Sequence, residues 1–194
     1  MIWNERLKIG VEEIDTQHEE LFSRFNLLLE YVINTKFDKI EKEKLKDTFD
    51  FLGSYVVEHF DKEEELQERV NYIDKEKHKI IHESFKKEVN EFIGKFYNNQ
   101  LTEESLMGFC GKISAWLINH VAEEDQKIAD FLNRKNAGVK IEGSFDINNS
   151  LIESAKATVQ NMLGIELENN GNYKNEKYLK IKVDTEDYRK RRKD

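Results

Sequence analysis

The sequence predicts an all-α protein: an antiparallel up-and-down four-helix bundle with a small C-terminal helix-plus-hairpin appendage. Three observations support this fold class. Four long stretches repeat apolar residues at steps of three and four, which is typical of helices with one buried face. The connections between these stretches are short, so neighbouring helices should run antiparallel. The composition then changes near residues 135–140, and we place a domain boundary there, between residues 1–134 and residues 140–194.

Each helix of the bundle is predicted from its own apolar stripe. The helices should cover about 17–35, about 41–68, about 74–97, and a stretch that begins after Thr102 and reaches Phe131. In order, the stripes are Leu21, Phe25, Leu28 and Val32; Leu45, Phe49, Leu52, Val56 and Leu66; Phe85, Val89, Phe92 and Phe96; and Leu106, Ile113, Leu117, Ile128 and Phe131. Thr102 is a suitable N-cap because acidic residues follow it in the first turn.

The C-terminal segment, residues 140–194, carries weaker signals. The pattern predicts a helix beginning at Ser150, a strand at 165–167, a turn at 169–172 and a second strand at 179–183. One helix and two strands are too few for an independent core, so the segment should lean on the bundle, self-associate or remain loosely ordered. Residues 150–167 faintly resemble the opening of CheX-like chemotaxis phosphatases, but they contain no catalytic motif of that family.

Charge and composition exclude several classes of function. The chain has 31 basic and 39 acidic residues, a net charge of −8, and residues 1–134 alone carry −10. An acidic surface argues against a nucleic-acid partner. No apolar run approaches the roughly 20 residues of a membrane helix, the first residues lack a signal-peptide pattern, and Cys110 is the single cysteine. We therefore expect a cytoplasmic protein without membrane contact, whose C-terminal segment could serve a protein partner or self-association.

The histidines indicate a metal site inside the bundle. The five histidines are His18, His59, His78, His82 and His120, at least one in each predicted helix and none elsewhere. His78 and His82 are four residues apart and share one helix face, as do His59 and Glu63. A buried carboxylate without a partner is costly, and a cation between the helices would remove that cost. Five independent core histidines are the alternative, but they would require five separate coincidences.

These residues stand in segments that resemble the bacterial hemerythrins over residues 1 to about 134. The matching segments are Trp3-Asn4, 9–11, 14–22, 59–64, Tyr72, His78, His82, Phe85, 116–120 and Asp125. Two departures are visible. Ile73 stands where the family commonly has proline, and Gln67 stands where it often has methionine. Neither departure is expected to touch a ligand.

The resemblance implies two non-haem iron ions with an oxo or hydroxo bridge. Carried over residue by residue, it assigns His78, His82 and His120 to one iron, His18 and His59 to the other, and Glu63 and Asp125 as bridges between them. Twelve octahedral positions then leave one open, on the iron with two histidines, where O2 would bind. Imidazole and carboxylate ligands suit non-haem iron.

The function implied by this resemblance is reversible dioxygen binding for storage, delivery or sensing, and not catalysis. Phe60, Trp116 and Leu117 would wall an apolar O2 pocket, although core packing explains Phe60 and Trp116 equally well. Two alternatives stay open: a di-iron redox enzyme acting on ferrous iron, peroxide or nitric oxide, and an oxygen-sensing module with residues 140–194 as its output.

Asp125 does not follow from helical spacing. It lies five residues after His120, which places it roughly 140° around an α-helix. Spacing alone would choose Glu124, whereas the resemblance chooses Asp125. Asp125 would therefore have to reach around the helix or sit on a local widening of it.

Overall fold

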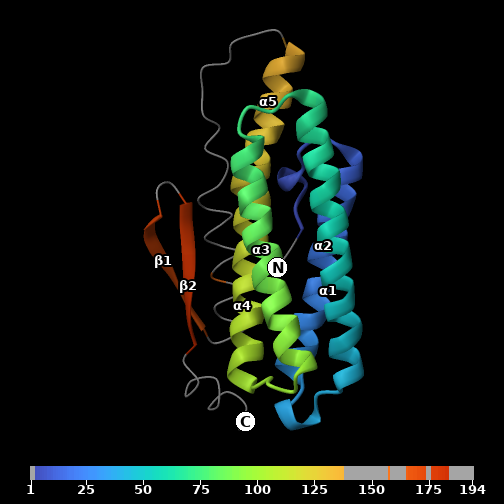
Figure 1. Cartoon of the computed structure of the whole chain (residues 1–194), viewed down its shortest axis with the longest axis vertical. Helices are drawn as coiled ribbons and strands as arrows, with labels where there is room; N and C mark the ends of the chain where they lie inside the picture. Colours follow the sequence, from blue (N-terminus) through green and yellow to red (C-terminus); the bar gives the residue numbers. More distant parts are fainter. Residues whose placement is uncertain (1–2, 138–156, 158–164, 174–175, 184–194) are drawn as a thin grey trace.

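The computed structural model describes residues 3–137, 157, 165–173 and 176–183, and four long helical rods dominate it (Figure 1). The bundle consists of α1 (Glu12–Asn34), α2 (Lys42–Val70), α3 (Lys75–Tyr97) and a fourth rod built from α4 (Glu103–Asn119), the π-helical segment η3 (His120–Glu124) and α5 (Asp125–Ala137). Short 3-10 turns, η1 (Glu5–Leu7) and η2 (Phe37–Lys39), precede α1 and α2. The all-α bundle is therefore confirmed, with α1 beside α2 and α4, and α2 beside α3.

Local sequence explains where the helices begin and end. Thr102 caps α4 as predicted: its hydroxyl oxygen accepts the Ser105 backbone N–H at 3.1 Å, and the Ser105 hydroxyl oxygen accepts the Thr102 backbone N–H at 2.9 Å. At the end of α2, Asn71 takes a left-handed conformation with φ of 54°, which closes the helix. The first helix starts earlier than predicted, at Glu12, so Asp15 lies in its first turn. The Asp15 carboxylate there accepts the backbone N–H groups of Ile9 (2.7 Å) and Gly10 (3.1 Å).

The buried apolar residues form two clusters of unequal size. The larger cluster fills most of the bundle and includes a group of phenylalanines around Phe49. The smaller one contains Ile9, Ile14, Leu66, Tyr72, Ile128 and Ala129. Along every rod, the histidines stand in sequence between residues of these two clusters or next to one of them, so a buried polar layer separates the two apolar regions.

The two strands form an antiparallel hairpin beside the bundle. β1 (Ile165–Tyr173) pairs with β2 (Glu176–Val183), with Ile165 opposite Val183, and β2 lies beside α4 (Figure 1). The hairpin is confirmed, but the predicted turn at 169–172 is wrong, because those residues continue β1 and the strand pairing extends past them to Tyr173 and Glu176. The predicted helix from Ser150, and most of the stretch that resembles CheX-like proteins, lie outside the described residues.

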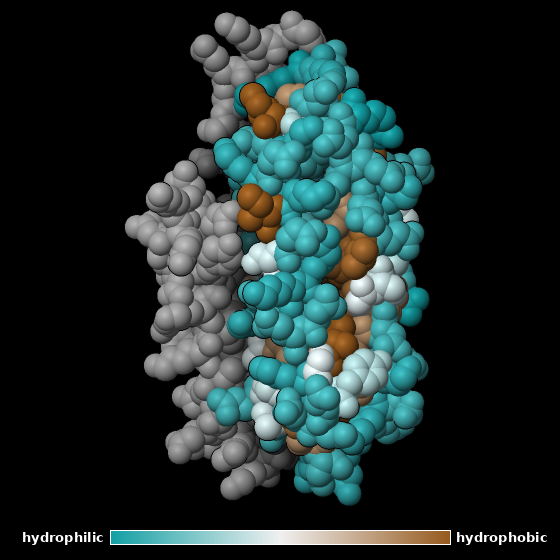
Figure 2. Space-filling model, viewed as in Figure 1, coloured by the Kyte–Doolittle hydropathy of each residue, from teal (hydrophilic) through white to brown (hydrophobic). Residues whose placement is uncertain are grey.

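The face of the bundle seen in Figure 2 is mainly hydrophilic. Figure 2 shows hydrophilic residues over most of the visible face, with hydrophobic ones confined to small areas between them. Among the described residues, no helix is long and apolar enough to cross a membrane.

Candidate metal centre

All seven side chains that the sequence analysis proposed as ligands are buried in one polar layer of the bundle. None is more than 3% exposed: His18, His59, Glu63, His78, His82, His120 and Asp125. Potential ligand atoms of Glu63, His78, His82 and His120 lie within 4.8 Å of one another, and so do those of His18, His59 and Glu63. The fold thus brings together residues that are more than 100 positions apart in the sequence.

Helix periodicity explains the positions on α1, α2 and α3. α2 presents His59 and Glu63, and α3 presents His78 and His82, each pair one turn apart on an inward face. His18 projects from α1. Its ring contacts that of His59 across the helix interface, with centroids 4.7 Å apart.

The π-helical segment η3 explains Asp125. Here the Asp125 backbone N–H donates to the carbonyl of His120, five residues earlier, so the helix is widened by one residue within this turn. Of the two alternatives considered for this position, the structure shows the local widening, and it puts Asp125 on the His120 face. Glu124 instead points outward, where its carboxylate pairs with the Lys127 ammonium group at 2.6 Å.

The Asp125 carboxylate faces two separate groups of histidines. Its Oδ1 lies 3.1 Å from His120 Nε2 and 3.4 Å from His78 Nε2. Its Oδ2 lies 3.1 Å from His18 Nε2. This arrangement of the two oxygens is the one that a carboxylate needs to bridge two cations.

The Glu63 carboxylate is placed in a similar way. Its Oε1 lies 2.7 Å from His78 Nε2, whereas its Oε2 lies 3.7 Å from His59 Nε2 and 3.9 Å from His82 Nε2. The two carboxylates therefore stand between a group of three imidazoles and a group of two.

Several imidazoles are oriented by a second layer of side chains. His59 Nδ1 lies 3.2 Å from the Gln17 side-chain oxygen, and His82 Nδ1 lies 3.1 Å from a Glu64 oxygen. Both partners are acceptors, so these Nδ1 atoms carry the proton and leave the Nε2 lone pairs directed into the centre. The hydrogen bond from His82, together with that from Lys79, lowers the pKa of Glu64 to about 2. Outer partners of this kind fix metal-binding histidines in the required orientation.

The polar atoms of the centre are not satisfied by the protein alone. Within the described part of the chain, the buried atoms that lack a hydrogen-bond partner include His18 Nε2, His78 Nε2, Glu63 Oε2 and both carboxylate oxygens of Asp125. Orphaned buried groups of this kind are costly, and convergent nitrogen and oxygen lone pairs are what a cation requires. The donor set, five imidazoles and two carboxylates, fits borderline divalent metals such as iron.

The pKa shifts of two histidines also favour metal binding. Burial lowers the pKa of both His59 and His120 well below the ordinary value, so these imidazoles are neutral, the form in which they bind metals. At His78 the effect of burial is outweighed by the nearby carboxylates of Asp125 and Glu63, which raise its pKa to about 10.

Aromatic rings stack directly on two of the imidazoles. The Phe60 ring lies on that of His82, with centroids 3.8 Å apart and planes 5° apart, and Trp116 lies on His120 at 4.2 Å and 16°. Leu117 is buried in the large apolar cluster, and its backbone carbonyl accepts the His120 N–H. The three residues proposed for the pocket therefore lie against or beside the ligands, on the side of the large cluster.

Gln67 contacts a proposed ligand, contrary to expectation. We expected this departure from the family pattern to leave the ligands untouched, but its side-chain N–H donates to Glu63 Oε1 at 2.8 Å. The spacing of four residues from Glu63 would have revealed it, because residues so spaced share a helix face. Gln17 and Glu64 were also missed as partners of His59 and His82.

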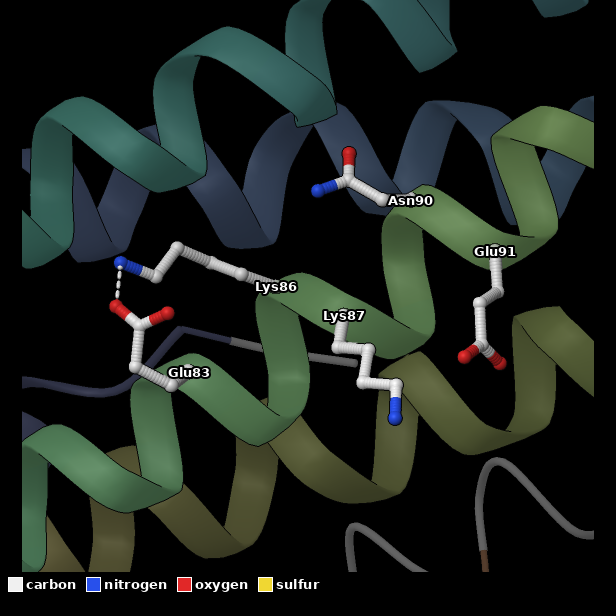
Figure 3. A pocket seen from close by; sticks show the side chains of 5 residues that line it. All are labelled: Glu83, Lys86, Lys87, Asn90 and Glu91. Carbon is white, nitrogen blue, oxygen red and sulfur yellow. Dashed lines mark ion pairs between the residues drawn. The ribbon is translucent and has the colours of Figure 1, made fainter.

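A hollow on the outer face of α3 is separate from this centre and is lined by charged and polar residues. It is lined by Glu83, Lys86, Lys87, Asn90 and Glu91, which all belong to one helix (Figure 3). The Lys86 ammonium group pairs with Glu83 there, and none of the proposed ligands lies in the hollow. Its charges are those of an ordinary solvated helix face.

Comparison with known proteins agrees with the buried centre. The family model described as Hemerythrin HHE cation binding domain matches residues 9–132. A bacteriohemerythrin of Stenotrophomonas maltophilia is 32% identical over 130 residues, which cover 67% of this chain and 80% of that protein. A bacteriohemerythrin of Clostridium acetobutylicum is 28% identical over 66% of this chain and 98% of its own length. A hemerythrin-like protein of Naegleria gruberi is 30% identical over 64% of this chain and 87% of its own.

Proposed function

Because the chain belongs to the hemerythrin family, we propose that it binds dioxygen reversibly at a non-haem di-iron centre in the buried polar layer. The observation that carries this proposal is the division of the imidazoles into a group of three and a group of two, with two carboxylates between them. The ligand assignment is His78, His82 and His120 for one iron, His18 and His59 for the other, and Glu63 and Asp125 as bridges.

The ligand composition favours binding over turnover. When bound, a pair of ferrous ions supplies the electrons that dioxygen binding requires. The chain contributes five neutral nitrogen donors and only two carboxylates, whereas carboxylate-rich bundles use Glu and Glu-x-x-His ligands. Fewer anionic donors stabilise the oxidised metals less, which supports a reversible carrier over a redox enzyme.

The aromatic wall supports the same proposal. Phe60 and Trp116 cover the faces of His82 and His120, and Phe85 stacks on Trp116 with centroids 3.7 Å apart. With Leu117 these residues place an apolar layer between the centre and the rest of the core. Such a layer excludes water and slows proton delivery, which would limit the irreversible loss of reduced oxygen.

The test is an optical spectrum of the iron-loaded protein, taken reduced, then in air, then after degassing. We expect a visible charge-transfer band that appears with oxygen and disappears on degassing. A band that persists, or an oxidised spectrum with peroxide released, would instead support the redox enzyme. No band with two irons bound per chain would contradict oxygen binding itself.

A sensing role is the second candidate, and the position of the hairpin favours it. β2 lies beside α4, the helix that carries Trp116 and leads directly into His120. A change at the centre could therefore reach the C-terminal segment through one rod. Truncation after residue 139 should then change oxygen affinity or oligomeric state. If it changes neither, and the full chain gains no partner on oxygenation, the segment is not an output.

A further inference from the structure

Gln67 lies against the centre without being one of the proposed ligands. We propose that it is a positioning residue, whose side-chain amide holds Glu63 in the orientation that bridges the two groups of histidines. This inference rests on the dinuclear centre proposed above and adds to it a residue at which this chain departs from the common family pattern.

The hydrogen bond determines which Glu63 oxygen faces which histidines. Gln67 Nε2 donates to Oε1 at 2.8 Å, and the same Oε1 lies 2.7 Å from His78 Nε2. Rotation of the carboxylate would break this bond, so Oε2 is kept on the side of His59 and His82, at 3.7 and 3.9 Å. The bond therefore keeps Oε1 beside His78 and leaves Oε2 facing one histidine of each group, His59 and His82.

The burial of Gln67 argues against a role in packing alone. Its side chain is fully buried, and its own Oε1 has no hydrogen-bond partner within the described residues. A buried amide that is only half satisfied costs free energy, and an apolar side chain of similar size would avoid that cost. Its one strong interaction is the charge-assisted hydrogen bond to Glu63.

The backbone holds Gln67 where this bond requires it. Its carbonyl oxygen accepts the Tyr72 N–H at 2.9 Å in the turn that closes α2, and Tyr72 is itself buried in the smaller apolar cluster. The last turn of α2 is thus fixed at both its backbone and its side chain. Gln67 does for a carboxylate what Gln17 and Glu64 do for His59 and His82.

The test measures metal affinity without oxygen chemistry. Apoprotein is titrated with Co2+ against a competing chelator, and the visible ligand-field spectrum is recorded for the wild type, Gln67→Met and Ser114→Ala. Ser114 is the matched control, since it is fully buried and its hydroxyl donates to the Cys110 carbonyl at 2.8 Å, away from the ligands. We expect Gln67→Met to weaken Co2+ binding about 10- to 100-fold and to change the spectrum, as loss of an outer partner commonly does. Ser114→Ala should leave both unchanged.

The outcomes separate this inference from the proposed function. Unchanged Co2+ affinity in Gln67→Met overturns the positioning role, as does an equal loss in Ser114→Ala. If circular dichroism shows that Gln67→Met is unfolded, Gln67→Glu replaces it, because it keeps the shape but sets an acceptor against Glu63. Affinity in Gln67→Glu equal to or tighter than wild type also overturns the proposal. Fewer than two Co2+ ions per wild-type chain would instead contradict the dinuclear centre.

Discussion

The bundle interior contains two contrasting regions, one of apolar aromatic side chains and one of buried polar side chains. At one end Phe49 packs edge-on against Phe92, Phe96 and Phe109, with ring centroids 5.0 to 5.9 Å apart, and Phe92 stacks on Phe109 at 3.8 Å. Phenylalanine rings carry no polar atoms, so their burial leaves no hydrogen-bonding group unsatisfied. Nearer the other end, the histidine layer buries polar atoms that the protein leaves without hydrogen-bond partners.

This difference indicates that the two regions contribute differently to the stability of the folded chain. The phenylalanine end lowers the free energy of the folded chain whatever is bound, whereas the histidine layer gains its full stabilisation only with cations in place. The same four rods run through both regions. Stability supplied at one end can therefore maintain an arrangement of unsatisfied polar groups at the other.

The largest effect is expected for Phe49→Ala, which removes the central ring of the phenylalanine group. Its ring is fully buried, so its removal should lower the free energy of unfolding by about 3–5 kcal/mol, measured by urea denaturation of the apoprotein. Phe51→Ala is the control, since Phe51 is half-buried and stacks on Tyr55 at 4.8 Å, and it should cost about 1 kcal/mol. Metal stoichiometry should stay at the wild-type value in both variants. A loss of metal in Phe49→Ala would show that the two regions are not separable.

Metal removal addresses the other end and should have the next largest effect. Because cations bind the folded chain, loading at about 100 times the Kd should add about 2.7 kcal/mol to the free energy of unfolding, and chelation should remove it. Thermal denaturation of apo and loaded protein at fixed concentration measures this gain. An unchanged midpoint on loading would mean that the histidine layer is satisfied without cations.

The smallest expected effect compares two neighbouring carboxylates. Asp125→Ala should reduce bound metal by at least one ion per chain and with it part of the gain on loading, because Asp125 faces both histidine groups. Glu124→Ala should retain wild-type metal content, since Glu124 pairs with Lys127 outside the centre. Elemental analysis of dialysed protein gives the ratio directly. Equal metal content in the two variants would refute the assignment of Asp125.

Much of this arrangement could be predicted from sequence because helical periodicity is a strong local signal. The stripes located all four rods to within a few residues, and the spacing of His78 from His82, and of His59 from Glu63, placed each pair on one face. His18 came from the same logic combined with the family resemblance. These positions depend only on regular α-helix geometry.

The remaining features depend on tertiary structure or on departures from regular geometry. The role of Gln67 required its neighbour across one helical turn to be considered, and the family pattern directed attention away from it. The turn of the hairpin was misplaced because the polar run at 169–172 is typical of turns, yet β1 continues to Tyr173 with an irregularity in the pairing after Asn170. The orientation of His59 by Gln17 joins two helices and leaves no local signal.

The π-helical segment changes which residues of the fourth rod face the bundle interior. A continuous α-helix of that length would carry one angular phase from Thr102 to Ala137, and its inward face would drift around the rod. The extra residue between His120 and Asp125 offsets that phase, so that Asp125, which would lie roughly 140° from His120 in an α-helix, joins His120 on the inward face. The segment thus sets the angular phase of α5 relative to α4.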